Sequence, residues 1–197
     1  MRIIGGAKRG LKLQAPLGDQ TRPTLERTRE DIMNILENGK FRGVLHQSNV
    51  ADVFAGSGSV GLEMLSRGAR CCTFFESSSD ALKALNANIK KFQICTMIVR
   101  KDALKPGNAP AFDVVFMDAP YNQDLTKKAF KAFLSKGLIN KDTLVVIQVA
   151  KTEDIPEITP FVIIDARKMG GAKVAFLKAP KLQENADDTL GVPEQLE

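Results

Sequence analysis

The feature that most constrains this chain is a short apolar run that breaks into closely spaced glycines. Residues 49–54 have the composition of a buried β-strand, Gly56, Gly58 and Gly61 follow, and a helical pattern begins near Ser59. Glycine lets a backbone turn tightly and approach a ligand, and the first N–H groups of the helix point over the turn. This order of elements predicts a site for a nucleotide-like molecule.

The glycine spacing alone leaves three interpretations open. Gly56-x-Gly58-x-x-Gly61 matches the fingerprint of dinucleotide-binding folds, and Glu76 follows at about the 20-residue distance expected of a ribose-binding acid. The same elements fit S-adenosylmethionine equally well. A glycine turn with a purely structural role is the third interpretation, and the rest of the chain has to decide.

Acidic residues end three predicted strands in succession. They are Glu76 after residues 71–75, Asp102 after 96–99 and Asp118 after 112–117. In a doubly wound sheet the ligand site lies beyond the carboxyl ends of the strands, so the three acids are expected to converge on the glycine turn. Each acid taken alone also fits the role of a helix cap.

The end of the pattern separates two classes of α/β protein. Apolar runs at 161–166 and 174–177 flank Gly170-Gly171 and predict an antiparallel hairpin that closes the sheet. We therefore expect a Rossmann-like doubly wound fold, mostly parallel, with a C-terminal antiparallel hairpin. This layout is typical of class I S-adenosylmethionine-dependent methyltransferases rather than of dinucleotide dehydrogenases.

Positive charge is concentrated in the body of the chain. The net charge is +5, but residues 183–197 hold five acids and no Lys or Arg, so residues 1–182 carry +10. A basic body predicts a polyanionic partner such as RNA or DNA. We expect a basic N-terminal β-hairpin over residues 1–24, a methyltransferase domain over 25–182 and a disordered acidic tail over 183–197. The residues predicted to bind RNA are Arg2, Lys8, Arg9, Lys12 and Arg22.

Composition argues against several other classes. No apolar run approaches the roughly 20 residues of a membrane-spanning helix, and the first residues lack the features of a signal peptide. The single histidine, His46, lies in a polar link, and Cys71, Cys72 and Cys95 lack the spacing of a zinc or redox site. We expect a monomeric cytoplasmic protein without a metal.

Asp118-Ala119-Pro120-Tyr121 resembles the Asp-Pro-Pro-Tyr motif of methyltransferases that modify exocyclic amino groups of nucleobases. The resemblance implies that Asp118 and a backbone carbonyl accept the two hydrogens of the amine while Tyr121 stacks on the base. Ala119 replaces the first proline of the motif. Because Ala119 precedes Pro120, its backbone is still biased to an extended conformation, and we expect the change to be tolerated.

From Met1 to about Lys178 the chain resembles the RsmD family of small-subunit ribosomal RNA guanine-N2 methyltransferases. The resemblance rests on Met1-Arg2-Ile3-Ile4-Gly5-Gly6, Arg22-Pro23-Thr24, Arg27-Thr28-Arg29-Glu30, Asp52-Val53-Phe54-Ala55-Gly56-Ser57-Gly58 and Leu65-Ser66-Arg67-Gly68-Ala69. Besides Ala119, the departures are Gln148 and Met169, where an acid and a tyrosine are expected.

The family resemblance also implies a cofactor and its ligands. S-adenosylmethionine is the methyl donor, S-adenosylhomocysteine is the product, and 16S ribosomal RNA or the small subunit is the substrate. The residues implied for the cofactor are Asp52, Gly56, Ser57, Gly58 and Gly61 for the methionine part, Glu76 for the ribose, and Asp102 with Ala103 for the adenine.

Three alternative functions remain at this point. The Asp118 motif serves any exocyclic amine, so an adenine-N6 methyltransferase on DNA or RNA is possible, although a separate target-recognition domain is not evident. Ala119, Gln148 and Met169 keep open a non-catalytic RNA-binding assembly factor. The glycine fingerprint is the sole support for a nicotinamide-dependent oxidoreductase.

Overall fold

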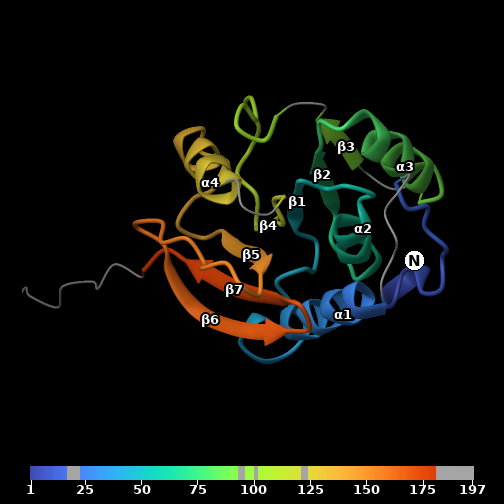
Figure 1. The fold of residues 1–197 in the computed structure, drawn as a ribbon, viewed down its shortest axis with the longest axis horizontal. Helices are drawn as coiled ribbons and strands as arrows, with labels where there is room; N and C mark the ends of the chain where they lie inside the picture. Colours follow the sequence, from blue (N-terminus) through green and yellow to red (C-terminus); the bar gives the residue numbers. More distant parts are fainter. Residues whose placement is uncertain (17–22, 93–95, 100–101, 121–123, 181–197) are drawn as a thin grey trace, which may run out of the picture.

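The computed structural model describes residues 1–16, 23–92, 96–99, 102–120 and 124–180 (Figure 1). The helices are α1 (Pro23–Glu37), α2 (Ser59–Ser66), α3 (Ser79–Lys90) and α4 (Leu125–Ser135), with short 3-10 turns η1 (Gly6–Lys8) and η2 (Gly39–Phe41). The strands are β1 (Asn49–Val53), β2 (Cys71–Phe75), β3 (Thr96–Val99), β4 (Val114–Met117), β5 (Leu144–Ala150), β6 (Val162–Met169) and β7 (Ala172–Lys178).

Within the described residues, the strands form one seven-stranded sheet in the order β3-β2-β1-β4-β5-β7-β6. The first five strands in this order are parallel, and β7 pairs antiparallel with both β5 and β6. The expected doubly wound sheet with a C-terminal antiparallel hairpin is therefore confirmed. The chain order reverses between β1 and β4, and a ligand site is expected beyond the carboxyl ends of these two strands.

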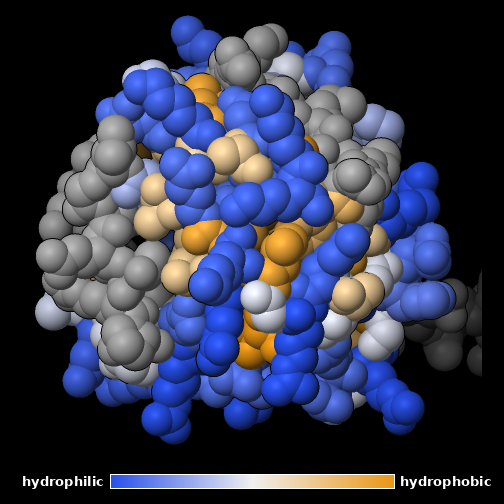
Figure 2. Space-filling view, turned by 90° about the vertical axis from the view of Figure 1, so that its right-hand side faces the viewer, coloured by the Kyte–Doolittle hydropathy of each residue, from blue (hydrophilic) through white to orange (hydrophobic). Residues whose placement is uncertain are grey.

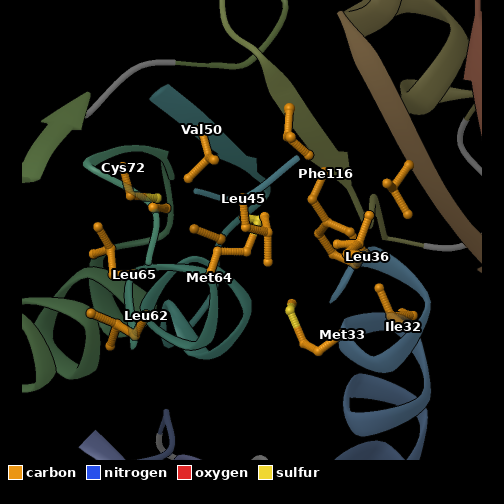
Figure 3. Close-up of a cluster of buried hydrophobic side chains, with 14 of the residues drawn as sticks. Ile32, Met33, Leu36, Leu45, Val50, Leu62, Met64, Leu65, Cys72 and Phe116 are labelled. Atoms are coloured by element: carbon orange, nitrogen blue, oxygen red, sulfur yellow. The ribbon is translucent and has the colours of Figure 1, made fainter. Parts of the chain in front are cut away.

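Alternate residues of the central strands enter two separate apolar clusters, one on each face of the sheet. Val50 and Val114 pack with α1, α2 and α3, whereas Ala51 and Val115 pack with α4. Figure 3 shows the first cluster, in which side chains from α1 and α2 meet Val50 of β1 and Phe116 of β4. Because neighbouring residues of a strand point to opposite faces, continuous apolar runs such as that of β5 are buried on both sides.

The expected N-terminal hairpin is present in a reduced form. Instead of two strands, residues 1–13 form a single antiparallel bridge between Arg2 and Lys12, with η1 between them. The backbone N–H of Ile3 donates to the carbonyl of Leu11 at 3.0 Å. Ile3 is fully buried in the α1–α2–α3 cluster, so this segment packs against the sheet domain.

A buried carboxylate fixes the N-terminal segment to α2. Glu63 is 0% exposed and accepts the backbone N–H groups of Ile4 and Gly5, both at 2.8 Å. It also pairs with Arg67 at 2.9 Å and with Arg29 of α1 at 3.6 Å. A buried charge is tolerated when it is paired and hydrogen-bonded, and here it joins three segments that are distant in sequence.

Candidate active site

A cavity of about 270 Å³ opens beside the carboxyl ends of β1, β4 and β5. The sequence-predicted residues that line it are Asp52, Gly56, Ser57 and Asp118. The remaining lining comes from Gln148 of β5, the loop residues Phe54 and Ala55, residues Ser59 and Val60 of α2, residues Glu26, Thr28, Arg29 and Ile32 of α1, and the N-terminal residues Met1, Ala15 and Pro16. The cavity therefore combines the glycine turn, the Asp118 motif and the first helix.

The glycine turn packs directly against β2. A Cβ atom added at Gly61 would lie 2.4 Å from the ring of Phe74, and one at Gly58 would lie 2.3 Å from Leu85. Because no larger residue fits at these two positions, α2 can begin close to the sheet. The N–H groups of Phe54 and Ala55 both donate to the carbonyl of Phe75, which ties the turn to the end of β2.

Asp52 lies at the centre of this arrangement. Its Oδ2 accepts the backbone N–H of Gly61 at 2.8 Å, and the residue is 2% exposed. Burial raises the pKa of Asp52 to about 7, although the Gly61 hydrogen bond acts in the opposite direction and the nearby Asp118 and Glu76 add to the increase. Asp52 therefore holds the start of α2 and faces the cavity.

Glu76 binds the glycine turn from the end of β2. Its Oε2 accepts the N–H of Gly56 at 2.7 Å, and its Oε1 accepts those of Ser77 and Ser78 at 2.8 and 2.7 Å. Glu76 is partly exposed, and each carboxylate oxygen can accept more than one hydrogen bond. The side chain can therefore bind hydroxyl groups while it keeps the turn in place.

The residues predicted for the adenine are farther from the cavity. Asp102 is exposed, its Oδ1 accepts the N–H of Leu104 at 2.9 Å, and Ala103 is buried. Neither Asp102, Ala103 nor Glu76 is among the residues that line the cavity. The structure thus links Glu76 to the glycine turn through Gly56, while the assignment of Asp102 and Ala103 stays a prediction.

Asp118 lies one residue beyond the end of β4 and is held by β5. Gln148 donates from Nε2 to Oδ2 of Asp118 at 3.0 Å. Burial raises the pKa of Asp118 to about 7, the Gln148 hydrogen bond lowers it, and Glu153 raises it. Ala119 is buried and Pro120 is exposed, whereas Tyr121 lies outside the described residues.

Two residues with a role near the site were not predicted from the sequence. Asn88 of α3 is fully buried, donates to the carbonyls of Gln14 and Ser57 at 2.9 Å and accepts the N–H of Gln14. Arg29 of α1 is 4% exposed, pairs with Glu63 at 3.6 Å and also lines the cavity. Asn88 lies on the same apolar side of α3 as Leu85, and a polar residue in such a position is the sequence signal that could have predicted a buried hydrogen-bonding role.

The basic residues of the N-terminal segment lie mostly at the surface. Arg2, Arg9 and Lys12 are exposed, Lys8 is half-buried, and Arg22 lies outside the described residues. Arg2 borders a groove of about 460 Å³ together with Arg27 and the acids Glu26, Glu30 and Asp31. The charge of this groove is mixed, with two cations and three acids, so the groove itself is not a positive surface.

The described part of the chain lacks two further features. No group of three or more His, Cys, Asp or Glu side chains is arranged to hold a metal ion there. None of the described helices is long and apolar enough to cross a membrane.

Comparison with known proteins adds independent information. The family described as "Conserved hypothetical protein 95" matches residues 1–178. The "Ribosomal RNA small subunit methyltransferase D" of Haemophilus influenzae is 34% identical over 81% of this chain and 83% of its own length. The protein of the same name from Escherichia coli is 28% identical over 95% of this chain and 93% of its own.

The fold has a counterpart among solved structures. The structure described as "Putative methyltransferase yhhF from Escherichia coli" superposes with a TM-score of 0.79 at 26% identity, and the match covers 91% of this chain and 97% of that one. The match extends over nearly all of the sheet and its helices.

Proposed function

The chain belongs to the conserved hypothetical protein 95 family, which is the RsmD family of ribosomal RNA small subunit methyltransferases, and on that premise we propose its reaction. It transfers a methyl group from S-adenosylmethionine to the exocyclic N2 amino group of a guanine in 16S ribosomal RNA. The observation that carries the proposal is that Asp118, fixed by Gln148, lines the same cavity as Asp52 and the glycine turn.

The donor groups of the cavity fit the proposed cofactor. When bound, S-adenosylmethionine supplies a methyl group already activated by a positively charged sulfur. Asp52 and Glu76 place carboxyl groups on either side of the glycine turn, and Glu76 has acceptor capacity left for ribose hydroxyls. Gly56 has no atom within 4 Å of where a Cβ would lie, so the backbone there is open to a ligand.

The Asp118 motif provides the groups that an amine needs. The lone pair of an aromatic amine is delocalised into the ring, so the nitrogen is a poor nucleophile until its hydrogens are held by acceptors. Asp118 accepts one of these hydrogens, and a backbone carbonyl of the Asp118-Ala119-Pro120 segment accepts the other. A carboxylate with a pKa of about 7 can then take the proton that leaves when the N–C bond forms. The protein's contribution is mainly to orient amine, methyl and sulfur in line.

The N-terminal segment supplies a surface for the RNA backbone. Figure 2 shows the side of the molecule on which this segment lies, where hydrophilic side chains surround a narrower apolar strip. The exposed cations Arg2, Arg9 and Lys12 project from a segment that Glu63 fixes to α2. A fixed array of cations binds phosphates at a lower entropic cost than a flexible one.

A transfer assay tests this function directly. Small ribosomal subunits from a strain that lacks this gene are incubated with the purified protein and S-adenosylmethionine carrying a labelled methyl group, and the label is mapped to a nucleotide. We expect N2-methylguanosine at one position of 16S ribosomal RNA. Asp118→Ala should abolish transfer while S-adenosylhomocysteine still binds, which calorimetry measures.

Other outcomes would assign the chain to the alternatives. Label recovered as N6-methyladenosine would replace guanine with adenine as the target. Binding of S-adenosylhomocysteine and of subunits without any transfer would identify a non-catalytic assembly factor. Preferential binding of NAD would contradict the interpretation of the glycine turn.

A further inference from the structure

Gln148 and Asp118 form a paired donor–acceptor unit at the edge of the cavity. They follow directly after Met117 and Ile147, the last two residues that pair β4 with β5, and Gln148 is still paired with Val174 of β7. Both side chains line the cavity. Gln148 is 6% exposed, and its Nε2 lies 3.0 Å from Oδ2 of Asp118. A buried side chain in regular strand pairing is held in a defined position.

The hydrogen bond fixes which way the amide of Gln148 points. The NH₂ group of Gln148 faces Asp118, as the ionised carboxylate requires because it only accepts hydrogen bonds, and Oε1 of Gln148 therefore faces away from Asp118. Among the described residues, no group donates to this Oε1. The one buried side-chain nitrogen or oxygen without a hydrogen-bond partner in that part of the chain is Nε of Arg29, so Oε1 of Gln148 is open to the cavity.

An open acceptor next to Asp118 matches one nucleobase and not the other. In guanine the exocyclic amine is adjacent to the ring N1–H, which is a donor. In adenine the exocyclic amine is flanked by N1 and N7, and both of these are acceptors. A carbonyl oxygen beside the group that holds the amine therefore gains a hydrogen bond from guanine and meets an unfavourable lone pair in adenine.

We propose that Gln148 is a specificity-determining residue whose Oε1 accepts the N1–H of the target guanine while its Nε2 holds Asp118 for the amine. This inference rests on the proposed function and adds to it the group that selects guanine. Gln148 thereby connects recognition of the base to the position of the residue that binds the reacting nitrogen.

A comparison of two bases in two proteins isolates this contact. Small-subunit RNA is prepared with guanine or with 2-aminopurine at the nucleotide that the labelling experiment identifies. 2-Aminopurine keeps the amine at C2 but has a lone pair in place of the N1–H. The measured quantity is the ratio of kcat/KM for guanine to that for 2-aminopurine, in the parent protein and in Gln148→Met, which has similar length and no hydrogen-bonding groups.

We expect the parent protein to prefer guanine by about 10- to 100-fold and Gln148→Met to lose most of that preference. The intrinsic reactivities of the two bases are the same in both proteins, and any loss of Asp118 orientation in the variant affects both bases. Both effects therefore cancel when the guanine preference of the variant is divided by that of the parent. Gln148→Glu keeps an acceptor oxygen toward the cavity, whether or not it shares a proton with Asp118, and should restore the preference to within about threefold.

A binding measurement covers the case of an inactive variant. Affinity for the two RNAs in the presence of S-adenosylhomocysteine gives the same preference without turnover, and the affinity for S-adenosylhomocysteine alone checks that the variant is folded. An equal guanine preference in the parent and in Gln148→Met would overturn the role of Gln148. Absence of methyl transfer to guanine by the parent protein would instead overturn the proposed function.

Discussion

At the scale of single residues, Asp118 should set the pH dependence of the reaction. Its pKa is raised to about 7, so the carboxylate is half protonated near neutral pH and loses acceptor capacity as the pH falls. We expect kcat/KM to increase with pH through about 7 and then to level off, since this parameter reports the free enzyme. Steady-state rates between about pH 5.5 and 8.5 measure the profile.

Two variants separate Asp118 from its titrating neighbour. Asp52 also has a pKa of about 7, so Asp52→Asn should retain the step in the profile if Asp118 causes it. Asp118→Asn should have a lower rate and no step near pH 7. A parent profile that is flat across this range would show that the ionisation of Asp118 does not limit the reaction.

Glu76 should act through the cofactor and not through the amine. Replacing it with Ala removes the acceptor for three backbone N–H groups and for the proposed ribose hydroxyls. We expect Glu76→Ala to weaken S-adenosylhomocysteine binding by about 1 to 3 kcal/mol and to act mainly on the KM for the cofactor. Asp80→Ala, an exposed acid of α3 that pairs only with Lys83 among the described residues, is the control in the same calorimetric titration. Equal affinities in the two variants would contradict the assignment.

The acidic residues of the site could be predicted from the sequence, whereas the residues that hydrogen-bond to them could not. Asp52 and Asp118 were found because each lies in or directly after an apolar strand, and the geometry of a parallel sheet brings such positions together. The bond between Gln148 and Asp118 spans 30 residues, and that between Asn88 and Gln14 spans 74. Both bonds depend on which strands and segments become neighbours, which single-residue patterns do not encode.

At the scale of elements, the N-terminal segment differs most from its prediction. The basic hairpin was interpreted as an appendage because its charge pattern is distinct from that of the sheet domain. Its apolar positions Ile3 and Leu13 are buried in the same cluster as α1 and α2, and Glu63 holds its backbone. Because Glu63 of α2 accepts the N–H groups of Ile4 and Gly5, the backbone of the N-terminal segment is held without extended strand pairing.

The basic side chains of this segment should account for part of the salt dependence of RNA binding. We expect the double variant Lys8→Ala/Arg9→Ala to reduce the slope of log affinity against log salt concentration by about 0.7 to 0.9 per lost phosphate contact. Affinity for S-adenosylhomocysteine should not change. Filter binding at several salt concentrations measures the slope.

The matched control lies on the other face of the sheet. Lys127→Ala/Lys128→Ala removes the same charge from α4, which packs against the opposite apolar cluster from the N-terminal segment. A non-specific effect of net charge would flatten the slope equally in both double variants. Only a larger change in the Lys8/Arg9 variant is compatible with a contact made by the N-terminal segment.

At the scale of the whole molecule, the sheet order was predictable and the composition of the cavity wall was not. Alternation of strands and helices, followed by the turn at Gly170-Gly171, was enough to predict the parallel sheet and its antiparallel end. Ala15 and Pro16 reach the cavity because Asn88 ties Gln14 to the glycine turn. The buried side-chain amide of Asn88 thus determines which part of the N-terminal segment borders the site.

The buried carboxyl groups of the site should also make global stability depend on pH. Asp52 has a folded-state pKa of about 7 against an ordinary value of 3.8, so between these values the folded protein retains a proton that the unfolded chain has released. Its contribution to the free energy of unfolding is therefore fully present below about pH 4 and is lost as the pH rises through about 7. Asp52→Asn keeps an oxygen that can accept the N–H of Gly61 but cannot ionise.

We expect Asp52→Asn to gain stability relative to the parent, by about 2 kcal/mol, when the pH is raised from about 5 to about 8. Urea denaturation at the two pH values gives the four free energies of unfolding, and the pH dependence of groups that do not interact with Asp52 cancels in the difference between the proteins. The neighbouring Asp118 is coupled to Asp52, so the double variant with Asp118→Asn measures its share. Asp142→Asn, an exposed position, should follow the parent at both pH values. If the parent and Asp52→Asn keep a constant difference across this range, Asp52 is ionised in the folded protein at pH 5, and the glycine turn already carries its negative charge before the cofactor binds.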